Sequence, residues 1–362
     1  MRLKRLAIDV RLWNQGGVGR YIRNLVKELH AIKPAYSITL IARPEEAAQV
    51  AEAAPSFHLL TSTARWHSYS EQVSWLTQLY SYHFDLVHFP YVSHPVLYQK
   101  PFVITIHDVT MFTHATGAAS TKSQPHYFLK QKAYRVVLAH GLRSSKTIIV
   151  PTHTVEEELT HVFHVPQERI MVTYEGVDAD LAQAKAVKTF VPARDFYLYV
   201  GNCYPHKNTE LLLRLAQGAK HPFVLVVSDD LFTDRMLMRA QELGVEKKIS
   251  VVRKVEDSVL KYLYQHARAL VFPSFKEGFG LPIVEAAYFN CPLAVSDIPA
   301  FREIAPPGTV FFDPHSYEQS QKALDTLPTH VNTSYPTSYM AQFSFLTMAK
   351  QTAEIYETRN CL

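Results

Sequence analysis

The chain has 362 residues, of which 47% are hydrophobic and 19% charged, with a formal net charge of +4 and a pI of about 8.7. These values are typical of globular proteins; they exclude a disordered chain, and the mild positive charge argues against a dedicated nucleic-acid binder. The length predicts two domains with separate cores. No run of about 18 apolar residues occurs, which argues against a membrane-spanning helix.

Cysteine use and the start of the chain bear on the compartment. Cys203, Cys291 and Cys361 are widely spaced and form no C-x-x-C pair, which fits a reducing compartment and offers no metal site. The basic start, Met1 to Arg5, leads into an apolar stretch that Asp9 soon interrupts, so no signal peptide is expected. We therefore predict a cytoplasmic protein without a bound metal.

Short strands rich in Val and Ile alternate with stretches of helical periodicity. In the first half the pattern predicts a helix at about 18–29 and strands at 6–10, 37–41, 85–88, 102–106 and 147–150. A polar stretch at about 176–194 interrupts the alternation. The second half predicts strands at 196–200, 223–227, 249–252, 269–272 and 293–295.

This alternation predicts an α/β fold with two doubly wound, Rossmann-like domains that face a cleft. We place the first domain at 1–176 and the second at 177–336, with a C-terminal helix at 337–362 that packs back on the first domain. Ligands of such sheets bind beyond the carboxyl ends of the strands, so the residues that follow each strand are the candidates for a site.

The segment from Pro273 to Ala286 follows a predicted strand and leads directly into a helix. Pro suits the first turn of a helix, where its missing N–H costs nothing. The amides at the helix start point outward and favour an anion or hydroxyl oxygens. The residues that would supply them are Gly278, Phe279, Gly280 and Leu281.

Two carboxylates flank this helix start. Glu277 lies in the loop before it, and Glu285 lies about one turn inside it. A carboxylate accepts paired hydrogen bonds from neighbouring hydroxyls, so two such groups suit a sugar or a ribose. The alternative is structural: Glu285 favours the helix dipole and Glu277 is an exposed loop acid.

A basic stretch interleaved with aromatic residues spans 122–146. We interpret it as a solvated helix face; the alternative is peripheral contact with anionic lipid headgroups at the inner face of a membrane. Its members are Lys122, Tyr127, Phe128, Lys130, Lys132, Tyr134, Arg135, Arg143 and Lys146.

The segment E-G-F-G-L-P-I-V-E-A, which begins at Glu277 and carries Glu285, resembles the signature of retaining glycosyltransferases of the GT-B fold, family four. Four other parts of the chain resemble that family in the same order: Ile8 to Arg11 with Gly16 to Tyr21, Ile106 to Asp108, Tyr199 to Gly201 with Pro205 to Asn208, and Ser296 to Glu303 with Phe312 to Pro314. The resemblance covers nearly the whole chain.

The resemblance implies roles for these residues. Glu277 would bind a hydroxyl of the donor sugar, Glu285 the ribose and Lys207 the diphosphate of a nucleotide sugar. Because Lys207 and the helix amides would stabilise the charge of the leaving diphosphate, no metal cofactor is expected. Gly201 and Asn202 belong to the same loop, although many relatives have Arg where this chain has Asn202. The alternative for Lys207 is an ordinary surface lysine.

The first domain supplies further candidates. His107 follows a predicted strand and would orient the reacting sugar or shift a proton near neutral pH; the alternative is a His satisfied by turn backbone. Gly16 and Gly17 would let a phosphate or an acceptor approach the backbone, or they form a purely structural turn. Their spacing is not G-x-G-x-x-G, so a nicotinamide cofactor is not expected.

The sequence thus predicts a hexosyltransferase that uses a nucleotide sugar, GDP-mannose as first choice and a UDP-sugar as second, and a glycan or glycolipid acceptor. Two rivals stay open. A GT-B nucleotide-sugar epimerase would bind the same donor without an acceptor, and a scaffold would bind a nucleotide or sugar without turnover.

Overall fold

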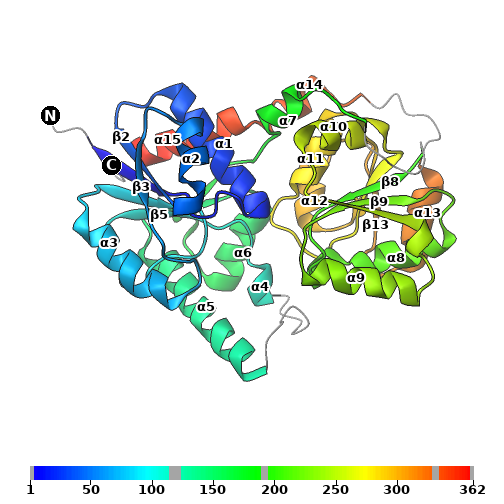
Figure 1. Cartoon of the computed structure of the whole chain (residues 1–362), viewed down its shortest axis with the longest axis horizontal. Helices are drawn as coiled ribbons and strands as arrows, with labels where there is room; N and C mark the ends of the chain where they lie inside the picture. The colour runs from blue at the N-terminus through cyan, green and yellow to red at the C-terminus, as the bar shows by residue number, and fades with distance from the viewer. Residues whose placement is uncertain (1–3, 114–123, 189–194, 328–333, 359–362) are drawn as a thin grey trace. The chain divides into compact units, whose positions relative to one another are not determined.

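The computed structural model describes residues 4–113, 124–188, 195–327 and 334–358, with only the backbone of 113 and 124–130. The chain divides into two compact units, each with its own sheet (Figure 1). Unit 1 comprises Met1–Phe112, Ser120–Glu175 and Ser344–Leu362, and unit 2 comprises Thr113–Ala119 and Gly176–Phe343.

Unit 1 contains a seven-stranded parallel sheet in the order β3-β2-β1-β4-β5-β6-β7. The strand order reverses between β1 and β4, and ligands of doubly wound sheets bind at such a switch point. The strands are β1 (Arg5–Asp9), β2 (Ser37–Ala42), β3 (His58–Thr61), β4 (Leu86–Phe89), β5 (Phe102–Thr105), β6 (Thr147–Val150) and β7 (Ile170–Val172). The helices are α1 (Gly16–Ile32), α2 (Ala47–Ala53), α3 (Leu76–Ser81), α4 (Thr110–Thr113), α5 (Gln124–Ser144), α6 (His153–Phe163) and α15 (Phe345–Thr358).

Unit 2 contains a six-stranded parallel sheet in the order β10-β9-β8-β11-β12-β13, with its switch point between β8 and β11. The strands are β8 (Tyr197–Val200), β9 (Phe223–Val227), β10 (Ile249–Arg253), β11 (Ala269–Phe272), β12 (Leu293–Ser296) and β13 (Val310–Phe312). The helices are α7 (Ala179–Gln183), α8 (Thr209–Gly218), α9 (Leu231–Glu242), α10 (Asp257–His266), α11 (Leu281–Tyr288), α12 (Pro299–Ile304), α13 (Tyr317–Thr326) and α14 (Thr337–Met340).

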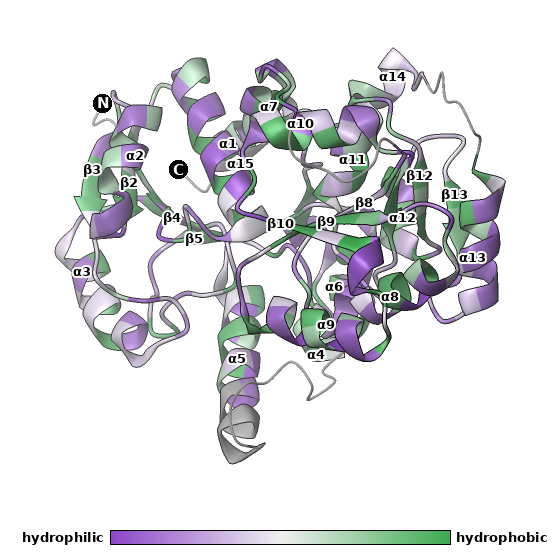
Figure 2. Ribbon diagram, turned by 45° about the vertical axis from the view of Figure 1, so that its right-hand side comes forward, coloured by the Kyte–Doolittle hydropathy of each residue, from purple (hydrophilic) through white to green (hydrophobic). Residues whose placement is uncertain are grey.

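The central strands are buried along their whole length, as β4, β6, β9 and β11 show. Helices cover the sheets and mix hydrophilic with hydrophobic residues (Figure 2), the pattern of elements with one face on a core. The predicted α/β class with two doubly wound domains is confirmed.

Two details differ from the sequence prediction. Strands β3, β7 and β13 were not predicted; each is three or four residues long, partly exposed, and at a sheet edge, so each apolar run is too short to indicate a strand by itself. The helix predicted at 337–362 is broken into α14 and α15, and residues 359–362 lie outside the described part. The break has a physical cause: Tyr339 and Phe343 pack in unit 2, whereas α15 packs on α1 in unit 1.

Candidate functional site

The loops that follow β8 and β11 lie side by side at the switch point of unit 2, because these two strands are neighbours. The loop after β8 carries Lys207 in a short 3-10 turn, and the loop after β11 carries Glu277. The two loops are joined by a backbone bond from Phe275 N to the carbonyl of His206, 2.8 Å long. Two segments 70 residues apart in sequence thus form one surface at the carboxyl edge of the sheet.

Lys207 and Glu277 form a tight ion pair on this surface. Lys207 Nζ lies 2.6 Å from Oε1 and 2.8 Å from Oε2 of Glu277, and Ser274 Oγ donates to Oε1 at 2.7 Å. Both side chains retain some exposure, 14% for Lys207 and 11% for Glu277. An ammonium group has three N–H donors. Two serve Glu277, so the third is available to an anion.

Asn208 fixes the position of this pair, a role that the sequence analysis did not assign. Its buried side-chain amide donates to the carbonyls of Pro273 at 3.1 Å and Pro314 at 3.0 Å, which follow β11 and β13. Its backbone is left-handed, with φ of 54°, a conformation that Asn tolerates better than most residues. Asn208 therefore ties three loops together next to Lys207.

The helix α11 begins as the sequence predicted, directly after the glycine-containing loop. Gly280 has φ of +120°, and a Cβ there would lie 3.0 Å from the Phe301 ring, so a larger residue would strain this turn. Gly278 and Phe279 are buried, whereas Leu281 at the helix start is partly exposed. The exposed part of the loop is therefore its two ends.

Glu285 lies inside α11 and is 3% exposed. Its Oε2 accepts a hydrogen bond from the buried Tyr264 hydroxyl at 2.8 Å. The structure thus directs one carboxylate oxygen of Glu285 into the contact between α10 and α11. Glu277 and Glu285 are held by different partners despite their closeness in sequence.

The remaining predicted residues of unit 2 follow β8. Gly201 is the first residue after the strand, and the Asn202 carbonyl accepts from the Tyr199 hydroxyl at 2.6 Å. Asn202 Oδ1 accepts from the Tyr204 amide at 3.2 Å, which turns the chain toward Lys207. The Asn side chain shapes the loop in this way, and it supplies no positive charge.

In unit 1, Gly16 and Gly17 are exposed in the first turn of α1 instead of preceding it. Gly16 has φ of +50°, and a Cβ there would meet open space. Gly19 is the sterically required glycine of this motif, because its Cβ would lie 2.5 Å from the carbonyl oxygen of Trp13. The helix start is therefore accessible and its close backbone packing depends on Gly19.

His107 follows β5 in unit 1 and is held through both ring nitrogens. Nδ1 lies 3.1 Å from Glu175 Oε1, and Nε2 lies 3.0 Å from the carbonyl oxygen of Pro90. Both partners accept hydrogen bonds, so the ring donates twice, which only the protonated imidazolium does. Burial lowers the pKa of His107, but the bond to Glu175 and its charge outweigh burial and raise the pKa. This geometry favours a fixed cation over a proton shuttle; Glu175 was not predicted.

Comparison with known proteins supplies the family. The family model described as Glycosyltransferase Family 4 matches residues 15–181, and the model described as Glycosyl transferases group 1 matches residues 182–330. Together the two matches span 15–330, and they identify the chain as a family-4-like glycosyltransferase. The two matches meet close to the division between units 1 and 2 and together include the candidate residues of both.

Relatives and a solved structure agree with this assignment. The O-antigen chain mannosyltransferase RfbU of Salmonella typhimurium is 27% identical over 67% of this chain and 65% of its own length. O-antigen chain mannosyltransferase B of Escherichia coli is 27% identical over 70% of each chain. The crystal structure of Anabaena HepE in complex with UDP is 17% identical, covers 98% of this chain and 100% of its own, and has a TM-score of 0.68. The glycosyltransferase has the GT-B fold.

A buried charge network supports the first loop of the glycosyltransferase. Arg11 is 1% exposed and bonds to both oxygens of Asp9 at 2.9 and 2.7 Å and to Glu71 at 2.9 Å. Its guanidinium lies 4.4 Å from the centre of the Trp75 ring. The sequence singled out Asp9 and Arg11 as part of a motif, but Glu71 carried no local signal because it lies 60 residues away.

The predicted basic stretch is only partly described. Lys132, Arg135, Arg143 and Lys146 are exposed, whereas Tyr134 is buried and stacks on Phe112. Lys122 and the side chains of Tyr127, Phe128 and Lys130 lie outside the described part. Contact with lipid headgroups, the alternative to a solvated helix face, therefore stays untested. No helix among the described residues combines the length and apolar composition that a membrane crossing requires.

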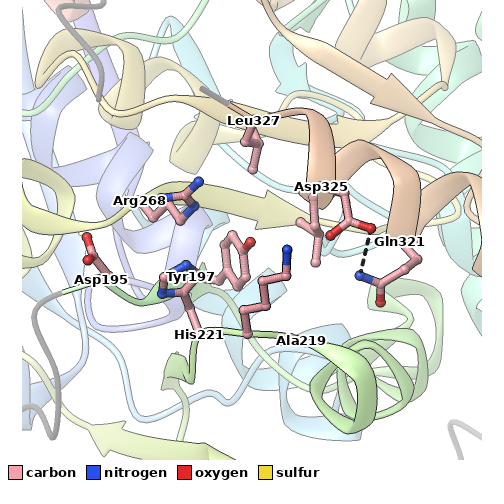
Figure 3. Close-up of a pocket in the computed structure, with 10 residues that line it drawn as sticks. Asp195, Tyr197, Ala219, His221, Arg268, Gln321, Asp325 and Leu327 are labelled. Atoms are coloured by element: carbon pink, nitrogen blue, oxygen red, sulfur yellow. Dashed lines mark hydrogen bonds between the residues drawn. The ribbon is translucent and has the colours of Figure 1, made fainter. Parts of the chain in front are cut away.

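One pocket of the glycosyltransferase has a volume of about 370 Å³, and Figure 3 shows the side chains that line it. It is lined by Tyr197 at the start of β8, His221 before β9 and Arg268 before β11, together with Asp325 from α13. These are the amino ends of the strands, the edge opposite to that of Lys207. Within the described residues, no three His, Cys, Asp or Glu side chains come together as ligands for a metal ion.

Proposed function

We propose that this glycosyltransferase transfers mannose from GDP-mannose, or second a sugar from a UDP-sugar, to a glycan or lipid-linked glycan of the O-antigen type. Family membership supports glycosyl transfer. The names of the two relatives, both O-antigen chain mannosyltransferases, support mannose and a polysaccharide acceptor. UDP bound to HepE supports a nucleoside diphosphate leaving group.

The Lys207–Glu277 pair at the switch point of unit 2 carries the proposal. We assign the diphosphate to Lys207 and to the amides of Gly278, Phe279, Gly280 and Leu281. Glu277 binds a hydroxyl of the donor sugar, and Glu285 binds the ribose. Gly201 and Asn202 line the proposed donor site next to Lys207. These assignments place acceptors at sugar hydroxyls and donors at phosphate oxygens.

The chemistry follows from these charges. As the bond between the anomeric carbon and the diphosphate breaks, its electrons pass to the diphosphate oxygen. Lys207 and the α11 amides stabilise this developing charge without a metal ion. The acceptor hydroxyl then attacks from the face that the diphosphate leaves and gives its proton to the departing diphosphate oxygen, and attack from that face retains the configuration. We assign the orientation of the reacting sugar to the His107 cation, and the approach of the acceptor or a phosphate to Gly16 and Gly17.

The test is incubation of the purified protein with GDP-, UDP- and ADP-sugars, with and without mannoside and lipid-linked acceptors. Acceptor-dependent release of GDP from GDP-mannose is expected, unchanged by a chelator, and NMR of the product should show the anomeric configuration of the donor. A new nucleotide sugar without acceptor would show an epimerase. Binding that raises the melting temperature without any turnover would show a scaffold.

A further inference from the structure

A chain of buried polar side chains runs from the C-terminal helix α15 to the neighbourhood of His107 in unit 1. It starts at Tyr356, which is fully buried and whose hydroxyl lies 2.6 Å from His88 Nδ1. His88 Nε2 lies 2.8 Å from Thr105 Oγ1, and Thr105 Oγ1 lies 3.2 Å from the Tyr21 hydroxyl. The ring of Tyr21 meets the ring of His107 edge-on, with 4.7 Å between centroids.

Two members of this network, His88 and Thr105, lie on the strands that lead to Pro90 and to His107. His88 lies on β4, two residues before Pro90, whose carbonyl accepts from His107. Thr105 ends β5, two residues before His107. The His88 ring therefore joins the two strand ends that present His107 and its acceptor.

The helix α15 carries a second buried hydroxyl beside the same network. Thr352 is one helical turn before Tyr356 and lies near the Tyr21 hydroxyl, and its own hydroxyl donates to the Met348 carbonyl at 2.8 Å. Residues four apart lie on one face of a helix. A helix that needed only to fill space would bury apolar groups here, because each buried polar group must be paired at a cost.

We propose that α15 is a positioning element of the transferase site, with Tyr356 and Thr352 as positioning residues that hold β4, β5 and Tyr21 in the arrangement that fixes His107. The inference rests on the role assigned to His107 under the proposed function. Under this proposal α15, although it is far from His107 in sequence, contributes to the reaction by positioning His107 as well as by packing in unit 1.

The test compares Tyr356→Phe with Tyr36→Phe. Tyr36 packs on Tyr356, with 6.2 Å between ring centroids, and its buried hydroxyl has no partner among the described residues, so it is a matched control for loss of one buried hydroxyl. Tyr356→Phe should lower kcat about tenfold with KM for the donor little changed, as expected when a reacting group is misplaced. The control should change neither.

Nitrogen-15 NMR of the His107 ring, assigned with a His107→Gln variant, supplies a readout that does not need transferase activity. Tyr356→Phe and Thr352→Val should shift or broaden both His107 ring N–H signals at a temperature where both variants are folded, and Thr352→Ser should restore them. If no nucleotide sugar is turned over, this arm alone decides. Wild-type His107 signals in Tyr356→Phe and Thr352→Val, with only a lower melting temperature, would show a purely structural helix and overturn the proposal.

Discussion

The Lys207–Glu277 ion pair allows the two proposed roles to be separated. Lys207→Gln removes the cation, and Glu277→Gln removes the carboxylate that occupies two of its three N–H donors. The proposed function assigns the third donor to a diphosphate oxygen. A charge-assisted hydrogen bond contributes about 1.5–3 kcal/mol, which corresponds to roughly 10- to 150-fold in affinity. GDP should therefore bind Lys207→Gln weaker by that factor.

Glu277→Gln should act in the opposite way on the product. The Lys207 charge is no longer neutralised by its partner, so GDP should bind with the wild-type affinity or more tightly. Turnover should nevertheless fall at least about tenfold, or 1.4 kcal/mol, because the contact to the sugar hydroxyl weakens. Titration calorimetry with GDP and a coupled assay of GDP release measure the two quantities.

The exposed pair of Arg239 and Glu210 in the same unit supplies the control, because Arg239→Gln removes a comparable ion pair from the surface. This variant should change neither GDP affinity nor turnover. If Lys207→Gln and Glu277→Gln lowered GDP affinity equally, the pair would be a structural brace and not an anion site. Undiminished turnover in both would refute the site altogether.

Three further predictions concern groups around the two sites. Burial and the charge of His107 lower the pKa of His88 from 6.5 to about 3, so the stability that neutral His88 contributes is present above pH 6.5 and is lost as the pH falls. Between pH 7 and pH 5 the free energy of unfolding should therefore drop by about 2 kcal/mol through this group. Denaturant titrations at several pH values should show this drop in the wild type and not in His88→Gln. Glu175→Gln should lower the pKa of His107, because burial then dominates. Since the proposed function needs the His107 cation, the decline of kcat at high pH should begin at a lower pH in this variant than in the wild type. Asn208→Ala should cost about 2–4 kcal/mol in chemical denaturation, since it leaves two buried carbonyls unpaired and puts Ala in a left-handed conformation; an unchanged denaturation midpoint would contradict this account of Asn208.

The fold was predictable wherever strands are buried on both faces. Such strands are continuous apolar runs, as in β6 and β9, and they stand out from amphipathic helices. The edge strand β13 has only three residues, Val310 to Phe312, and an apolar run of that length does not by itself indicate a strand. The break before α15 depends on which core receives Phe343, and that is a property of the folded units.

The candidate site was predictable only in its local part. The segment from Glu277 to Glu285 carries its own signal, because glycines, a helix start and two acids lie within nine residues. Its pairing with Lys207 depends on β8 lying next to β11, and strand order is not written in either segment. Glu175 was missed for the same reason: a single acid after a short edge strand has no pattern until β7 places it near His107.

Each unit holds a candidate cation against a carboxylate. A cation that awaits an anionic ligand is costly to hold partly desolvated on its own, and its long side chain would sample many positions. Lys207 is held by Glu277 and His107 by Glu175, each through hydrogen bonds to carboxylate oxygens. In each pair the carboxylate lowers the net charge, and under the proposed function Glu277 fixes Lys207 where negative charge develops on the diphosphate. Because the dipoles are already oriented, stabilising a leaving diphosphate requires little reorganisation at the moment of reaction. Under the same proposal, Lys207 without Glu277 would attract the diphosphate more strongly before the reaction and would gain less in the transition state.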